Sequence, residues 1–170
     1  MSNNVIIRAF SPEDADAVTA IYRHHVLTGT ATFEEQPPHR EEMLNRLSRL
    51  TVKRFPVLVA CTSNDEVIGY AYAGPYKARS AYRYTVEDSI YVAPGNMRKG
   101  IGQALLMQLI SECRTREYKQ ILAVIGDSDN QGSISLHRTC GFVHVGTADN
   151  LGFKFDRWLD VVFMQLSLEA

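Results

Sequence analysis

The sequence predicts a mixed α/β fold, in which a mostly antiparallel sheet is covered by helices on both faces. Two observations support this prediction. Short apolar runs separated by polar turns, which indicate hairpins, dominate the first half of the chain, and strand-like runs alternate with helical patterns in the second half. No repeat or linker divides the 170 residues, so we expect a single domain over residues 1–170.

Each element is expected from a local pattern. Apolar runs predict strands at residues 5–9, 57–61, 67–73, 84–92, 121–125, 142–146 and 158–168. Apolar residues at helical spacing predict helices that begin after Ser11 and at residues 40–50, 101–113 and 133–140. Ser11, Pro12 and two acids are a typical helix start, and Gly141 suits the position after a helix end. Helical spacing fails over residues 28–38, where we expect a loop.

Composition and charge exclude several classes of protein. A formal net charge of −1 gives no general attraction to nucleic acid or anionic membrane. No apolar run approaches the roughly 20 residues of a membrane span, and the first residues lack a signal-peptide pattern. Three widely spaced cysteines form neither a disulfide framework nor a zinc site, and the adjacent His24 and His25 are poorly spaced as metal ligands. We therefore expect a cytoplasmic protein that binds no metal, nucleic acid or membrane.

The segment from Tyr91 to Leu105 carries the clearest chemical signal. A strand ends, a turn follows, and a helix begins at Arg98-Lys99-Gly100-Ile101-Gly102. Unpaired N–H groups and the helix dipole favour an anion at such a start, glycines let it approach, and the basic pair adds charge. The segment therefore indicates a phosphate or pyrophosphate site. An ordinary solvated helix start fits the spacing equally well, but the motifs of P-loop and dinucleotide-binding proteins are absent.

This loop resembles that of a known family. Arg98-x-Gly100-x-Gly102-x-Ala104 after a Tyr-Val strand end is similar to the coenzyme A loop of the Gcn5-related N-acetyltransferases, although Met97 stands where that family usually has Gln or Arg. Further segments resemble the phosphinothricin and methionine sulfoximine acetyltransferase branch, namely residues 74–82, residues 86–92, Leu136-His137-x-x-x-Gly141-Phe142 and Lys154-Phe155-x-x-Trp158-x-Asp160.

The resemblance implies a Gcn5-related acyltransferase fold with acetyl-coenzyme A as co-substrate, bound in the wedge between the predicted strands 84–92 and 121–125. The residues expected to contact it are Val92, Arg98, Lys99, Gly100, Ile101, Gly102, Gln103 and Asn130. Within the family, the N–H near Val92 polarises the thioester carbonyl and the asparagine binds the pantetheine arm. Asn130 is equally suited to cap the following helix.

Glu87 is the candidate general base, because an ammonium must lose a proton before its nitrogen attacks a thioester. Strand alternation places Glu87 on one face with Ser89 and Tyr91. Asp88 then falls on the opposite, apolar face, so it is either a buried partner or a sign of a bulge. A solvated edge-strand carboxylate is the alternative for Glu87, which the family resemblance nevertheless favours over Asp88 as the base.

His137 is the candidate general acid. In the wider family a tyrosine often protonates the departing thiolate from this helix position, and the branch named above has a histidine there. His137 could alternatively take part in proton removal, and a histidine packed near a helix end is the non-catalytic alternative. Cys140 lies three residues away and is conceivable as a thiol nucleophile, but a small buried residue fits its place better. We therefore expect direct attack in a ternary complex, without an acyl-enzyme.

A basic and aromatic cluster is the candidate substrate site. Lys77, Arg79 and Tyr82 suit a free amino acid's carboxylate and match substrate-contacting positions of the branch, although a solvated loop is the alternative. Phe33 resembles an apolar wall of the pocket. Residues 153–158 are expected in the pocket, in a homodimer contact or in the core.

We therefore expect an enzyme that acetylates the amino group of a small amino-acid-like substrate. The alternatives are a protein or peptide N-terminal acetyltransferase and a non-catalytic coenzyme A sensor.

Overall fold

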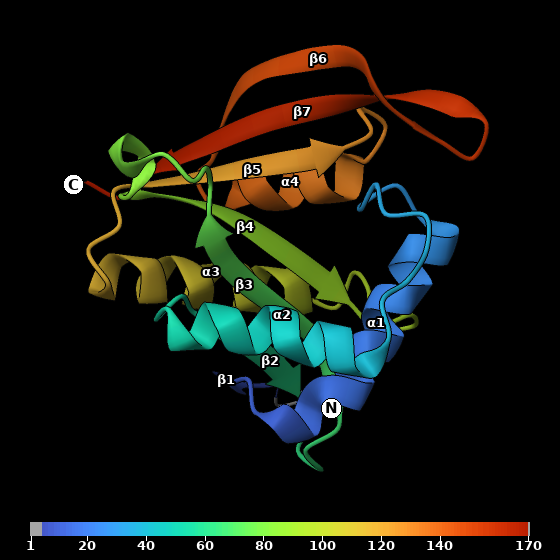
Figure 1. The fold of residues 1–170 in the computed structure, drawn as a ribbon, viewed down its shortest axis with the longest axis vertical. Helices are drawn as coiled ribbons and strands as arrows, with labels where there is room; N and C mark the ends of the chain where they lie inside the picture. The colour runs from blue at the N-terminus through green and yellow to red at the C-terminus, as the bar shows by residue number, and fades with distance from the viewer. Residues whose placement is uncertain (1–4, 170) are drawn as a thin grey trace.

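The structure is a computed structural model, and it describes residues 5–169. Its centre is a seven-stranded sheet with the order β1-β2-β3-β4-β5-β7-β6 (Figure 1). The strands are β1 (Ile6–Ala9), β2 (Val57–Cys61), β3 (Val67–Pro75), β4 (Thr85–Val92), β5 (Gln120–Gly126), β6 (Val143–Lys154) and β7 (Arg157–Ser167). Among the strands of residues 5–169, only β4 and β5 pair in parallel. The predicted mixed, mostly antiparallel sheet is confirmed.

Helices cover both faces of this sheet, as predicted (Figure 1). One face carries α1 (Ala15–Thr28) and α2 (Arg40–Val52), and the other carries α3 (Ile101–Thr115) and α4 (Gln131–Thr139). Two short 3-10 helices complete the fold, η1 (Pro12–Asp14) and η2 (Ser80–Tyr82). None of the helices within residues 5–169 has the length and apolar content to cross a membrane.

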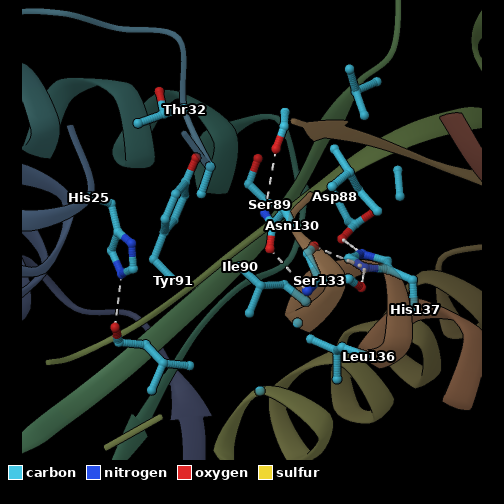
Figure 2. A pocket seen from close by; sticks show the side chains of 18 of the residues that line it. His25, Thr32, Asp88, Ser89, Ile90, Tyr91, Asn130, Ser133, Leu136 and His137 are labelled. Atoms are coloured by element: carbon cyan, nitrogen blue, oxygen red, sulfur yellow. Dashed lines mark hydrogen bonds and ion pairs between the residues drawn. The ribbon is translucent and has the colours of Figure 1, made fainter. Parts of the chain in front are cut away.

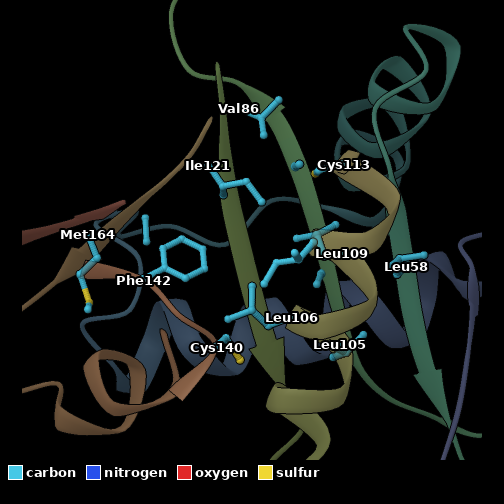
Figure 3. Packing of buried hydrophobic residues seen from close by; sticks show 14 of the residues in the cluster. Leu58, Val86, Leu105, Leu106, Leu109, Cys113, Ile121, Cys140, Phe142 and Met164 are labelled. Atoms are coloured by element: carbon cyan, nitrogen blue, oxygen red, sulfur yellow. The ribbon is translucent and has the colours of Figure 1, made fainter. Parts of the chain in front are cut away.

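The apolar stripe of α3 forms the larger core. Leu105, Leu106 and Leu109 are fully buried, and they pack against the sheet near Val86 and Ile121 (Figure 3). Burying one such side chain contributes about 1.5–3 kcal/mol. This packing fixes the start of α3, and with it the predicted anion loop, against the end of β4.

The start of α1 follows the predicted capping pattern. The Ser11 N–H donates to Asp14 Oδ2 at 2.8 Å, and Pro12 opens η1, which leads directly into the helix. Arg8 in β1 donates to both carboxylate oxygens of the buried Asp14, at 2.8 Å each. The pair attaches the helix start to the edge strand of the sheet.

The prediction for β6 was wrong in length. The strand was expected at residues 142–146, but it continues to Lys154 and forms a long hairpin with β7 that projects from the sheet (Figure 1). The turn consists of Phe155 and Asp156, both at positive φ (53° and 56°). Because it lacks the Asn-Gly or Asp-Gly pair typical of such turns, no local signal marked it. The other predicted strands, and the helices at residues 40–50, 101–113 and 133–140, begin and end within two residues of the observed elements.

Candidate active site

The candidate site lies where β4 and β5 part. Their parallel pairing covers only Thr85–Gln120, Val86–Ile121 and Glu87–Leu122, although β4 continues to Val92 and β5 to Gly126. A cavity of about 910 Å³ lies at this divergence, and its lining includes the ends of both strands. The wedge expected from the sequence is therefore present.

The parted end of β4 turns backbone groups toward the gap. Ala93 N donates to Ile68 O in β3, so alternation along the strand turns the N–H and C=O groups of Ile90 and Val92 toward β5. His25 Nε2 lies 2.8 Å from Val92 O (Figure 2). A carbonyl only accepts, so the ring donates there. The N–H groups of Ile90 and Val92 face the gap, where they are available to a ligand.

The loop between β4 and α3 has the geometry of an anion site. Gly95, Arg98 and Gly100 have positive φ angles of 78°, 60° and 80°, and α3 begins without a side-chain cap. The first N–H groups of the helix are therefore available to an anion. The loop and first turn contribute Met97, Arg98, Gly100, Gly102 and Gln103 to the cavity lining.

Two residues of this loop, Lys99 and Ile101, are not among the residues that line the cavity. Lys99 Nζ donates to Asn96 Oδ1 at 3.4 Å. The Ile101 side chain is buried in the core, because it belongs to the apolar stripe of α3, so only its backbone faces the loop. Gly102 has a second reason to be small, since a Cβ there would lie 3.2 Å from Leu136 Cδ2 in α4.

Asn130 has the capping role that was the alternative to ligand binding. Its Oδ1 accepts from Ser133 N at 3.2 Å at the start of α4. The residue also lines the cavity. The side-chain oxygen is therefore occupied by the cap. The amide nitrogen makes only a long hydrogen bond, of 3.5 Å, to Gly126 O.

Glu87 lies in the cavity wall on the face that the sequence predicts. It is half-buried and pairs with Gly74 in β3. Burial, followed by the neighbouring charge of Asp88, raises the pKa of the Glu87 carboxyl above its usual value. A carboxylate with a raised pKa is a better proton acceptor near neutral pH.

Asp88 is the buried partner, and no bulge is present. The register between β3 and β4 runs without a shift from Pro75–Val86 to Gly69–Val92. Asp88 therefore points to the opposite face, where its Oδ2 lies 2.9 Å from His137 Nε2 (Figure 2). Burial lowers the pKa of His137, but Asp88 and the Ser133 carbonyl outweigh this effect, so the pKa lies above its ordinary value.

The loop between α1 and α2 forms another wall, as predicted for Phe33. The Phe33 ring lies between Gly126 and Gly152, so close that an added Cβ at either glycine would overlap it. The buried Lys154 holds the same loop, because its Nζ donates to Gly29 O and Thr32 O at 2.8 Å each. The β6–β7 hairpin and this loop therefore fix one another beside the cavity.

The Lys77, Arg79 and Tyr82 cluster is not part of the cavity lining. Lys77 Nζ lies over the ring of Tyr82 at 5.9 Å, in a loop that is largely exposed. The loop begins directly after Pro75, the last residue of β3. Gly74, the residue before it, pairs with Glu87 in β4. The cluster is therefore connected to the Glu87 end of the site, but its side chains do not reach the cavity.

Several lining residues were not anticipated, most of them apolar or small. They include His25, Ser133, Leu151, Val161 and Phe163. Of these residues, only His25 was considered from the sequence, and only as a poorly spaced metal ligand. Burial lowers the pKa of His25, so its neutral ring serves as a backbone donor instead.

Two chemistries considered from the sequence find no support in the described part of the chain. Cys140 belongs to the buried core outside the cavity lining, and burial followed by the charge of Asp88 raises the pKa of its thiol. Within residues 5–169, no group of three or more His, Cys, Asp or Glu side chains is arranged to hold a metal ion. The cavity instead combines an anion loop, strand N–H donors and a half-buried carboxylate, which suits acyl transfer.

The chain belongs to the Gcn5-related N-acetyltransferases. The family model described as an acetyltransferase (GNAT) domain matches residues 7–163, and the sheet that parts between β4 and β5 agrees with this assignment. The chain is accordingly an N-acetyltransferase.

Relatives with specific names cover nearly the whole chain. The phosphinothricin N-acetyltransferase of Alcaligenes faecalis is 47% identical over 164 residues, which cover 96% of this chain and 83% of that protein. The L-amino acid N-acyltransferase of Escherichia coli (strain K12) is 38% identical, with 96% and 94% covered. A phosphinothricin acetyltransferase from Sinorhizobium meliloti, solved in complex with AcCoA, superposes with a TM-score of 0.93 at 44% identity, covering 96% of this chain and 88% of that one.

Proposed function

We propose that this chain transfers the acetyl group of acetyl-coenzyme A to the amino group of a small amino-acid-like molecule. The parting of β4 and β5 beside Glu87 carries the proposal, because it gathers strand N–H donors, a free helix start and a half-buried carboxylate around one cavity. The names of the relatives support the substrate class, since one acts on phosphinothricin and another on L-amino acids.

Acetyl-coenzyme A fits this cavity by its chemistry. Its pyrophosphate is an anion for the N–H groups at the start of α3, and Arg98 adds charge there. Its pantetheine amides match the N–H and C=O groups that face the gap from β4. The thioester carbonyl then accepts from the Val92 N–H, which stabilises the developing oxyanion.

Two matched glycine variants test the cofactor site. Gly100 and Gly95 both have positive φ, near 80°, and a Cβ would meet nothing within 4 Å at either one, so alanine strains both similarly. Only Gly100 lines the cavity. We expect Gly100→Ala to weaken acetyl-coenzyme A binding about tenfold or more, equivalent to about 1.4 kcal/mol, and Gly95→Ala to leave it unchanged. Calorimetry measures both, and equal affinities would contradict the site.

We assign the proton transfers of the reaction to two titratable groups, Glu87 and His137. An ammonium loses two protons as it becomes an amide, and the departing thiolate gains one. Glu87, whose pKa is raised, accepts the first proton directly or through water, and the amine then attacks the thioester in the ternary complex. His137 donates to the thiolate as the tetrahedral intermediate collapses. One proton reaches solvent in each turnover.

The carboxylate of the substrate needs a cationic partner, and we assign this role to the loop that contains Lys77, Arg79 and Tyr82. The exposure of Arg79 and the departure of this loop from the strand end beside Glu87 support the assignment. The loop reaches the cavity only by moving toward it, so ordering upon substrate binding is part of the proposal.

Arg79→Ala tests the substrate class, with Arg83→Ala as its control. A charge-assisted hydrogen bond is worth about 1.5–3 kcal/mol, so we expect Arg79→Ala to raise the KM of an amino acid roughly tenfold or more. The KM of acetyl-coenzyme A should stay unchanged. Arg83 is occupied within the loop, where it donates to Ser80 O and stacks on Tyr84, so its loss should matter little.

Thiol release with free amino acids and their amides completes this experiment. If the wild-type enzyme turns over amides or peptide amines as well as free acids, the carboxylate site is refuted. A protein N-terminal acetyltransferase would then take its place.

The β6–β7 hairpin supports a homodimer. Its exposed apolar side chains include Val145, Leu151, Phe153 and Trp158, each more than half exposed. Large exposed apolar side chains grouped on one hairpin indicate an interaction site, and a second copy of the chain is the partner we propose. Sedimentation velocity measures the oligomeric state directly. The three buried, unpaired cysteines support a reducing compartment, and we place the enzyme in the cytoplasm.

A further inference from the structure

Lys154 is a buried lysine at the end of a largely exposed strand. It is 2% exposed, and it is the only buried residue of β6, which forms one arm of the projecting hairpin (Figure 1). Lysine is almost never fully buried unless its amino group is paired. The partners of Lys154 are two main-chain carbonyls in the loop between α1 and α2, Gly29 O and Thr32 O, at 2.8 Å each.

The end of β6 presents Lys154 and Gly152 to this loop. The register with β7 runs without a shift from Gly152–Leu159 to Lys154–Arg157, so residues 152 and 154 share one face of the strand. The Phe33 ring occupies the space that a Cβ of Gly152 would fill. Phe153 lies between the two and belongs to the opposite face, where it is half exposed. The same strand end therefore leaves room for the Phe33 ring and holds the main chain that leads to it.

The loop depends on side chains from other elements for its position. In the described part of the chain, the only hydrogen bond to the main chain of residues 30–33 is the one that Lys154 donates to Thr32 O. A second contact reaches the side chain of Thr30, whose Oγ1 donates to Asp127 Oδ2 at 3.2 Å. Lys154 alone bridges two carbonyls of the loop, so it is the group that fixes the course of the backbone there.

This backbone segment forms part of the cavity wall. Ala31, Thr32 and Phe33 line the same cavity as Glu87, whereas Lys154 does not. Glu87 shares its face of β4 with Tyr91, which packs against α1, so the loop that leaves α1 lies on the side of the proposed base. Any effect of Lys154 on acetyl transfer therefore passes through the loop.

We propose that Lys154 is a positioning residue that sets the width of the amine site by holding the main chain next to Phe33. The inference rests on the proposed acetyl transfer to an amino-acid-like amine, whose side chain has to fit beside the Phe33 wall. Removing the amino group of Lys154 leaves Gly29 O and Thr32 O without a partner. Buried carbonyls without a partner favour a displaced loop in which water reaches them.

Lys154→Met tests this proposal, because methionine keeps an unbranched apolar stem and removes the donors. We expect kcat/KM for the amine to fall about 10–100-fold, as for other misplaced substrates, and the affinity for acetyl-coenzyme A to stay the same. The preference for a small over a large free amino acid should decrease. Lys119→Met is the matched control, since Lys119 pairs with Glu169 at the surface, and it should change none of these values.

The Phe33→Ala background separates positioning from general stabilisation. If Lys154 acts through the Phe33 ring, Lys154→Met should not alter the preference between the two amino acids once the ring is absent. An unchanged preference in the wild-type background, or an equal change in both backgrounds, would overturn the proposal.

A measurement on the wild-type protein guards against a variant that does not fold. Backbone order parameters of residues 30–33, from ¹⁵N relaxation without substrate, should be near 0.85, the value of rigid backbone, and values below about 0.6 would overturn the proposal. Absence of acetyl transfer to any free amino acid, together with rigid values for this loop, would instead refute the proposed function.

Discussion

Replacing Glu87 with glutamine is expected to lower kcat by about 10²–10⁴-fold, because the amide cannot accept the ammonium proton. Glutamine keeps the size of the side chain, so contacts in the cavity wall are preserved. Glu87 is half-buried beside Asp88, and both effects raise its pKa. The acidic limb of kcat/KM should therefore lie above the ordinary glutamate value of about 4.3 in the wild type, and it should disappear in the variant.

The stability of the folded variant is the control for this prediction. The direction in which Glu87→Gln changes that stability follows from the raised pKa of Glu87. A carboxyl whose folded pKa is raised binds more protons in the native state than in the unfolded state. The free energy of unfolding therefore decreases as pH rises from the unfolded toward the folded pKa. Glu87→Gln removes this penalty, so at neutral pH its melting temperature should equal or exceed that of the wild type. Full activity with an unchanged pH profile would shift the base role to another group or to water.

Gly152→Ala is expected to displace Phe33 from the wall of the cavity. A Cβ at position 152 would meet Phe33 Cζ at 3.0 Å, and two other ring carbons more closely still. Overpacking of this kind costs about 1–3 kcal/mol. Because the Phe33 loop lines the cavity, the KM of the amine should also rise, while the distant anion loop keeps its affinity for acetyl-coenzyme A.

Gly146→Ala is the matched control, because it lies in the same strand and an added Cβ would meet nothing within 4 Å. The free energies of unfolding of the two variants, measured with denaturant, should differ by about 1–3 kcal/mol. The Phe33→Ala substitution in the Gly152→Ala background should remove most of the overlap and restore part of the lost stability. If Gly146→Ala and Gly152→Ala are equally stable, the ring is not held between the glycines.

Sequence reasoning identified the groups whose place depends on local pattern. Strand alternation placed Glu87 on one face with Ser89 and Tyr91, and it left Asp88 on the opposite face with two possible explanations. The unshifted register decides for a buried partner. The glycine loop lies at the start of α3 as the sequence predicts, whereas the helix stripe turns the Ile101 side chain into the core.

Local patterns in the chain predict the alternation of strands and helices, the apolar stripe of α3, the glycine loop at its start and the face on which Glu87 lies. These features repeat over a few residues, and backbone geometry relates such repeats directly to structure. Two contacts became known only from the three-dimensional fold: Asp88 meets His137, 49 residues away, and Phe33 lies between Gly126 and Gly152. Contacts of this kind depend on where β4 and β5 part and how the β6–β7 hairpin folds back, and no local period in the chain encodes either one.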